Sequence, residues 1–282
     1  MTLSNQQRSS IKEVLIASLR DKFTNYNPEP ASMPFHTRLL GKDRLELYAF
    51  IHSLNTNFGT TIFEPVAAAL ATPRFKKVET QIKAGKFISS ESQLEIQRIM
   101  DGLTTASIYP DKIKETEVLR KLAQKGRMIE VKPTRVDIFL ESNDGELFLF
   151  DIKTAKPNAG SFKEFKRTLL EWVSVTLAEN PSKKVNTIIA IPYNPYEPEA
   201  YNRWTMRGML DLERELKVAD EFWDFLGGEG TYQNLLDCFE MVGIEMREEI
   251  DNYFKKFKEK TIGVSLPRTI RKSGLVRGPQ WF

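Results

Sequence analysis

The chain has 282 residues, of which 41% are hydrophobic and 28% are charged, as in ordinary soluble globular proteins. This length is enough to bury a sizeable core, and no apolar run approaches the length of a membrane span. The formal net charge is only +3, so composition alone is a weak indicator of a nucleic-acid partner. The single Cys238 excludes an intramolecular disulfide framework and a metal site built from several cysteines.

The positive charge is concentrated at the C-terminus. Residues 261–282 contain Arg268, Arg271, Lys272 and Arg277 and no acidic residue, so the rest of the chain is near −1. We therefore expect one folded domain over residues 1–260 and a basic tail over 261–282 that contacts phosphates. The N-terminus lacks the apolar core of a signal peptide, which indicates a cytoplasmic protein.

Helical periodicity is present at both ends of the chain and between the strand-like segments. The predicted helices cover residues 10–19, 43–54, 90–103, 111–132, 162–178, 209–226, 231–242 and 246–259. The 111–132 stretch has mixed charge and is typical of a surface helix. Ser161 is a candidate N-cap for the helix over 162–178.

A further helix start is indicated at residues 57–71, where a Gly/Thr segment leads into an alanine-rich run that contains Glu64. Two interpretations of this acid remain open. In the first, Glu64 lies in a first helical turn, where the helix dipole favours a negative charge. In the second, it is an active-site acid carried on a helix beside the sheet, since its apolar neighbours offer nothing that neutralises it.

Two strand-like segments are joined by a tight turn. Residues 134–140 and 145–153 are apolar and β-like, and Asn143-Asp144-Gly145 between them is a hairpin signal. Because side chains alternate along a strand, Asp151 and Lys153 point to the same face while Ile152 points to the core. The hairpin also brings Asp137 close to Asp151.

This spacing, Asp-x13-Asp-x-Lys, suits phosphodiester hydrolysis. Asp137 and Asp151, helped by the carbonyl oxygen of Ile152, can bind a hard cation such as Mg²⁺. Such a cation activates water and stabilises a leaving oxygen, while Lys153 can orient the water. The alternative is that Asp144 and Asp151 are turn and strand-end acids and that Lys153 is a solvated loop residue.

The segment after Lys153 predicts a βαβ unit. A loop over 154–161 precedes the helix over 162–178, and residues 185–192 form another apolar strand, so these two strands should be parallel. The loop carries Lys156 and Asn158, where a DNA backbone would run. The later segment over 193–208 carries Asn194, Arg203 and Arg207 among aromatic residues, a composition suited to base-edge and phosphate contacts or, alternatively, to an irregular packed loop.

Four motifs make the sequence similar to a known family. They are GTTIFE at 59–64, DIKTAKPN at 151–158, IPYNPY at 191–196 and RWTMRG at 203–208. They resemble the TdeIII-type family of type II restriction endonucleases, and the resemblance covers most of residues 40–255. Val136 stands where the family's nominal motif has a proline before the first acid.

The resemblance implies an α/β restriction-endonuclease-like fold of the PD-(D/E)XK type, with a central mixed sheet flanked by helices and helical additions at both ends. It also implies cleavage of double-stranded DNA with Mg²⁺, or Mn²⁺ as a substitute, at a short, GGNCC-like palindrome. A palindromic target implies a homodimer, and a methyltransferase would be the genetic partner. Two other hypotheses stay open: a nuclease of the same fold in repair or branch resolution, and a non-catalytic DNA-binding protein.

Overall fold

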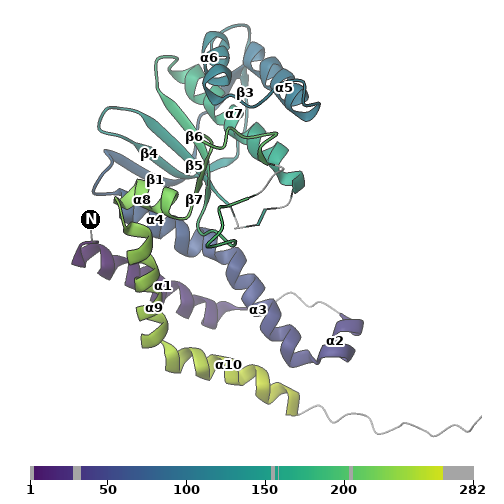
Figure 1. Ribbon diagram of the computed structural model, residues 1–282, viewed down its shortest axis with the longest axis vertical. Helices are drawn as coiled ribbons and strands as arrows, with labels where there is room; N and C mark the ends of the chain where they lie inside the picture. The colour runs from purple at the N-terminus through teal and green to yellow at the C-terminus, as the bar shows by residue number, and fades with distance from the viewer. Residues whose placement is uncertain (1–2, 28–32, 154–155, 158, 203–205, 263–282) are drawn as a thin grey trace, which may run out of the picture.

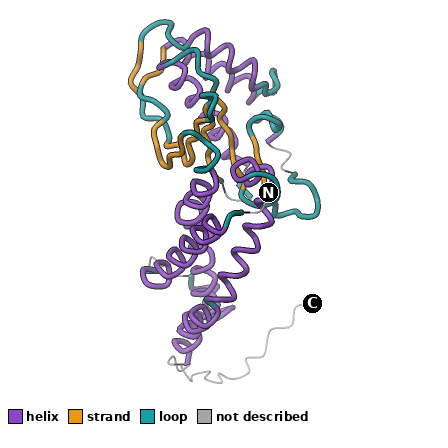
Figure 2. Tube along the Cα trace, turned by 90° about the vertical axis from the view of Figure 1, so that its left-hand side faces the viewer, coloured by secondary structure: helices purple, strands orange, loops and turns teal. Residues whose placement is uncertain are grey.

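The computed structural model describes residues 3–27, 33–153, 156–157, 159–202 and 206–262 (Figure 1). Asn158, Arg203 and residues 263–282 of the expected basic tail lie outside the described residues. In the described part of the chain, the strands lie in one half of the molecule and the other half is helical (Figure 2). Within the described residues, we find no helix long and apolar enough to cross a membrane.

A mixed five-stranded sheet forms the centre of the upper half (Figure 1). Its strands, in spatial order, are β1 (Lys77–Lys83), β4 (Arg135–Glu141), β5 (Leu147–Ile152), β6 (Val185–Ile191) and β7 (Leu216–Val218). The first three are antiparallel neighbours, and β5, β6 and β7 are parallel. The predicted hairpin and the predicted parallel pair are both confirmed.

The β4–β5 hairpin closes as its turn residues predict. The Gly145 N–H donates to the Ser142 carbonyl at 3.0 Å, and Gly145 has a φ of 80°. A glycine adopts this left-handed conformation without a steric penalty, which is why a hairpin turn uses it here. The turn fixes the register between the two strands, and that register decides which side chains meet at their far ends.

Helix α7 (Phe162–Glu179) connects β5 to β6 and covers one face of the sheet. Helices α5 (Ser90–Thr104) and α6 (Lys112–Leu122) pack on the same side, with the small pair β2 (Phe87–Ser89) and β3 (Met128–Glu130) beside them. Leu169 and Val173 of α7 are fully buried in this core. Ser161 is the N-cap residue of α7, as expected, but its side chain makes no capping bond, because it ends a 3₁₀ turn, η2 (Ala159–Ser161), with a helical backbone conformation.

The opposite face is covered by helices from both ends of the chain. These are α1 (Asn5–Asn25), α4 (Glu64–Ala71), α8 (Asp220–Gly227) and α9 (Thr231–Glu245). Trp223 of α8 is fully packed there, and its ring nitrogen donates to the Pro192 carbonyl at 2.8 Å. The expected helical additions at the two ends are therefore confirmed.

The remaining helices extend away from the sheet (Figure 1). Helix α2 (Pro34–Leu40) is followed by α3 (Lys42–Phe58), and α10 (Arg247–Ile262) packs along α3. Helix α3 continues through a π-helical turn, η1 (Gly59–Phe63), directly into α4. The chain from Lys42 to Ala71 is thus one helical run with a change of pitch before Glu64.

Two predicted helices are partly wrong. The stretch over 209–226 contains turns, strand β7 and only then helix α8, and the stretch over 111–132 contains α6 and strand β3. In both cases a mixed polar sequence contains a three-residue edge strand. The pairing of each depends on a distant segment, since β7 pairs with β6 and β3 pairs with β2. Such short strands carry too little periodicity to distinguish them from a helix.

Candidate active site

Asp137 and Asp151 face each other where the β4–β5 hairpin opens. The ladder ends at the Ile138–Phe150 pair, and these two acids occupy the next opposed positions. Asp137 Oδ2 accepts a hydrogen bond from the Ile152 N–H at 2.8 Å, so a side chain replaces the next backbone bond of the ladder. The expected approach of Asp137 to Asp151 is therefore present, and the hairpin register produces it.

Asp151 is nearly excluded from solvent, with 4% of its surface exposed. Burial raises the pKa of its carboxyl, the ammonium of Lys153 lowers it, and the neighbouring Asp137 raises it; together these effects give a pKa of about 6. The charged form of a buried acid next to a second acid is costly in the absence of a cation. The site is thus a place where positive charge is strongly favoured.

Lys153 supplies part of that charge. Its Nζ lies 2.6 Å from Asp151 Oδ1 and 5.0 Å from the centre of the Phe165 ring on α7. Its backbone N–H donates to the Ala190 carbonyl at 2.9 Å, which anchors the residue beside β6. Lys153 is therefore held against Asp151 and Phe165 and is not a freely solvated loop residue.

Glu64 reaches the same site from the other face of the sheet. It is 4% exposed, and burial raises its pKa. Because α3, η1 and α4 are continuous, the Glu64 N–H donates to the Gly59 carbonyl, and there is no free helix N-terminus here. The helix-dipole explanation therefore does not apply. A π-helical turn within a helix is frequently found at a functional site, and here it immediately precedes the buried acid.

Gln81 of β1 is a site residue that sequence reasoning missed. Its Nε2 donates to Glu64 Oε2 at 2.9 Å and to Asp137 Oδ1 at 3.0 Å, so it joins the helix acid to the strand acid. In the sequence it is one polar residue in a polar strand, and no local pattern marks it. Its role becomes visible once β1 is paired with β4.

The donor set fits a hard divalent cation in its chemistry. Asp137, Asp151 and Glu64 offer carboxylate oxygens, the ligands that Mg²⁺ prefers, and two of these acids are strongly desolvated. As the side chains stand, no group of three His, Cys, Asp or Glu residues within the described part of the chain is assembled as a metal site. The bonds from Gln81 and Lys153 each engage one oxygen of a carboxylate, namely Oε2 of Glu64, Oδ1 of Asp137 and Oδ1 of Asp151.

The predicted DNA-contacting residues lie beyond this strand end or outside the described residues. Lys156 is exposed, and its Nζ lies 5.1 Å from the centre of the Tyr196 ring, which joins the two loops that follow β5 and β6. Asn194 stabilises its own loop, since it accepts from the Tyr196 N–H and donates to the Glu199 carbonyl. Arg207 is exposed.

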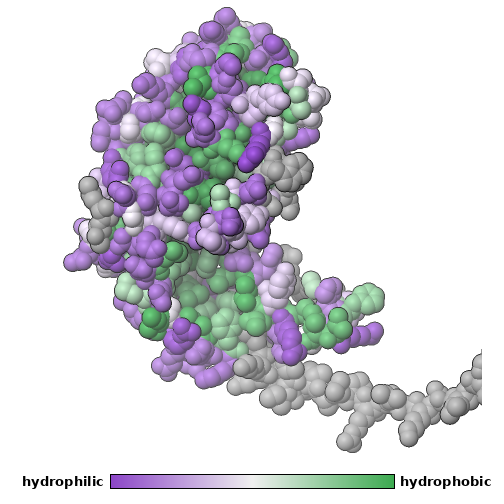
Figure 3. Space-filling model, viewed as in Figure 1, coloured by the Kyte–Doolittle hydropathy of each residue, from purple (hydrophilic) through white to green (hydrophobic). Residues whose placement is uncertain are grey.

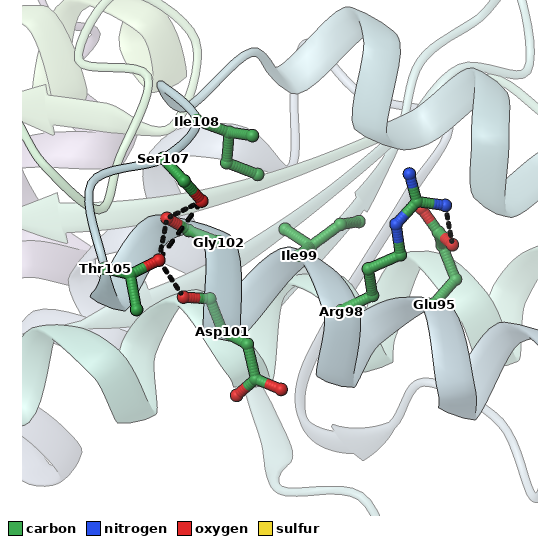
Figure 4. Close-up of a pocket in the computed structure, with 8 residues that line it drawn as sticks. All are labelled: Glu95, Arg98, Ile99, Asp101, Gly102, Thr105, Ser107 and Ile108. Carbon is green, nitrogen blue, oxygen red and sulfur yellow. Dashed lines mark hydrogen bonds and ion pairs between the residues drawn. The ribbon is translucent and has the colours of Figure 1, made fainter.

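A cavity of about 350 Å³ lies on α5 (Figure 4), and none of the strand-end acids lines it. Its hydroxyl groups, from Thr105 and Ser107, bond to backbone carbonyls at the end of the helix and to each other. Glu95 and Arg98 at its other end form an exposed ion pair. These groups already have partners, so the cavity does not compete with the strand-end acids as the candidate site.

The fold and the arrangement of its acids define a restriction-endonuclease-like protein. A helix acid, an antiparallel hairpin that ends in two acids and a lysine, a crossover helix and a parallel strand follow one another along the chain. A model of the family "Type II restriction endonuclease, HinfI" matches residues 3–243. The chain belongs to this family and is a site-specific endonuclease.

Named relatives of the chain are also type II restriction enzymes. The chain is 26% identical over 281 residues to the type II restriction enzyme MjaII of Methanocaldococcus jannaschii, covering 89% of this chain and 74% of the relative. It is 26% identical to HgiCII and 25% identical to HgiEI, type II restriction enzymes of Herpetosiphon aurantiacus, over 77% of this chain and 80% and 79% of those relatives. The expected enzyme class is confirmed, and the matching family model is that of HinfI rather than TdeIII.

Proposed function

We propose that this restriction endonuclease hydrolyses double-stranded DNA with Mg²⁺ at the strand-end site of β4 and β5. The observation that carries the proposal is a pair of facing acids, the half-buried Asp137 and the buried Asp151, with Lys153 held 2.6 Å from Asp151. Family membership supplies the reaction class, and this geometry supplies a place where it can occur.

Each residue has a distinct task in this proposal. Asp137, Asp151 and the carbonyl oxygen of Ile152 hold the cation, with Glu64 as a further ligand, direct or through water. Bound Mg²⁺ would polarise the phosphate and lower the pKa of a bound water. Lys153 orients the attacking water and offsets charge on the phosphate. The burial of Asp151 keeps competing solvent away from the carboxylates.

Digestion of plasmid DNA by the purified protein tests this proposal. With Mg²⁺ we expect discrete fragments whose ends share one short palindrome, and GGNCC-like sequences are the first to examine. With EDTA we expect no cleavage. Nicking confined to branched or damaged DNA would indicate a repair nuclease instead, and binding without any cleavage would indicate a non-catalytic DNA-binding protein. A methyltransferase that protects the same site would be the genetic partner.

A palindromic target leads us to propose a homodimer with one active site for each strand. Helix α2 supports this, because none of its residues is buried. Phe35 and Leu39 are 83% and 82% exposed, and Tyr48 of α3 is 65% exposed. Figure 3 shows apolar side chains on the surface at the end of the molecule where α2 lies. Clustered exposed apolar side chains mark interaction surfaces. Sedimentation equilibrium should find a dimer, and a monomer at the concentrations that cleave DNA would exclude this assembly.

The proposed DNA contacts are Lys156, Asn158, Asn194, Arg203 and Arg207. Of these, Arg207 gives the clearest test. If Arg207 binds a guanine edge with two hydrogen bonds, Arg207→Ala should cost about 1–3 kcal/mol on the target sequence and much less on random DNA. Gel-shift titrations on the two DNAs measure both values. An equal loss on both would make Arg207 a phosphate contact.

Metal binding should weaken below pH 6. Because the pKa of Asp151 is raised to about 6, protons compete with the cation there, whereas an ordinary aspartate competes only near pH 4. Only about a tenth of this carboxyl is ionised at pH 5, so calorimetry should give at least tenfold weaker Mn²⁺ binding at pH 5 than at pH 7. Equal Mn²⁺ affinity at the two pH values would contradict the assignment of Asp151 as a ligand.

The same shift has the opposite consequence for the metal-free fold. A carboxyl whose pKa is raised on folding contributes stability at low pH that is lost as the pH rises through about 6.

A further inference from the structure

Gln81 has a backbone conformation that is unusual for its place in a strand. It lies in the middle of β1, opposite Asp137, between the Thr80–Ile138 and Ile82–Val136 pairs. Its φ is 56°, in the left-handed region that residues with a Cβ atom rarely adopt. Such strain persists only where the surrounding structure holds it, and it is frequent at functional sites.

This conformation reverses the side-chain alternation of β1. Val78 and Ile82 are four residues apart and would share a face in a regular strand. Instead, Val78 packs against the core beneath α1 and α4, whereas Ile82 packs against the core beneath α5 and α7. The left-handed residue at the point of reversal brings the Gln81 amide between Glu64 of one helix layer and Asp137 of the sheet.

The chemistry of this position favours an amide. The Gln81 nitrogen carries two hydrogens and donates one to each acid, at 2.9 Å and 3.0 Å. It links two carboxylates without adding a charge of its own. A lysine could also donate to both acids, but its ammonium would compete with a cation, and an acidic residue would repel both carboxylates.

We propose that Gln81 is a positioning residue of the active site, which orients Glu64 and Asp137 together as oxygen ligands. This inference rests on the proposed function, because it assumes that these acids bind the cation. Side chains that orient metal ligands typically change metal affinity by 10- to 100-fold when they are replaced. Because Gln81 acts through the acids, its replacement should change Mn²⁺ affinity even when no DNA is present.

Two substitutions separate the amide from the backbone. Gln81→Met keeps the length of the side chain and removes both donors. Gln81→Gly also removes them, and it accommodates the φ of 56° without strain. We expect both variants to bind Mn²⁺ about 10- to 100-fold more weakly than the wild type in calorimetry. Gln81→Gly should do so with no loss of thermal stability beyond that of the methionine variant.

A matched control is Gln233→Met on α9, an exposed glutamine whose amide also faces a carboxylate, that of Asp237. It should leave Mn²⁺ affinity unchanged. In a Glu64→Gln background, Gln81→Met should cost less than in the wild type, because one of the two acids it orients has been neutralised. An equal cost in both backgrounds would overturn the proposed link to Glu64.

The outcomes distinguish this inference from the function on which it rests. If the wild type binds no Mn²⁺, or Asp151→Asn binds it as well as the wild type, the proposed active site is wrong and Gln81 has no role there. If those two proteins behave as expected but Gln81→Gly binds Mn²⁺ within about twofold of the wild type, only the positioning role is overturned.

Discussion

We expect Asp151→Asn to lose DNA cleavage by at least about 10³-fold, because it removes a ligand of the cation that stabilises the transition state. It should also lose Mn²⁺ binding at this site. The fold should survive, since asparagine has nearly the same shape and the wild-type acid is itself costly to ionise in the metal-free protein. Specific DNA binding should persist, because the proposed base contacts lie on other segments.

Lys153→Ala should separate chemistry from metal binding. An ammonium is not a ligand, so this variant should keep Mn²⁺ and still lose cleavage. Asp144→Asn is the matched control, because Asp144 is an exposed acid in the β4–β5 turn at the opposite end of the hairpin. A digest and a calorimetric titration of each protein measure both properties. Cleavage by Asp151→Asn near the wild-type rate would remove Asp151 from the active site.

The second large effect concerns a buried charge network under α7, which the proposed chemistry does not use. Lys166 Nζ bonds to Glu115 and, at 2.7 Å, to Glu215. Lys112 Nζ lies 3.2 Å from the same Glu215 and also bonds to Thr187. Every one of these side chains is at most 8% exposed. Two ammonium groups and two carboxylates thus balance within the core.

Glu215→Gln should destabilise the protein by about 3–5 kcal/mol, because it leaves an uncompensated positive charge in the core. Urea unfolding measures the loss. The control is Glu249→Gln, which breaks an exposed pair with Arg20 and should leave the urea midpoint nearly unchanged. A cost for Glu215→Gln as small as that of the control would show that the network is not held as a buried, balanced set.

The parts of the fold that sequence predicts are those with local signals. The hairpin over residues 135–152 follows from two apolar runs and a glycine turn, and the α7 crossover follows from helical periodicity between two such runs. Asp137, Asp151 and Lys153 could be found because strand alternation and the hairpin turn are enough to bring them together. Their distances and burial then follow from the register.

The parts that sequence does not predict depend on distant partners. In the sequence, Lys166 is one polar residue within a predicted helix, but its two carboxylate partners lie 51 and 49 residues away along the chain. Gln81 lies 17 residues from Glu64 and 56 from Asp137, and its left-handed backbone has no glycine to indicate it. Polar burial of this kind is satisfied by tertiary contacts, so a local pattern contains no trace of it.

The central claim is that the acids at the open end of the β4–β5 hairpin bind the cation that cleavage requires. Anomalous diffraction from crystals soaked in Mn²⁺ tests it most directly. We predict an anomalous peak within bonding distance of carboxylate oxygens of both Asp137 and Asp151, and its absence in crystals of Asp151→Asn. A peak at saturating Mn²⁺ that contacts neither acid, or no peak at all, would contradict the claim.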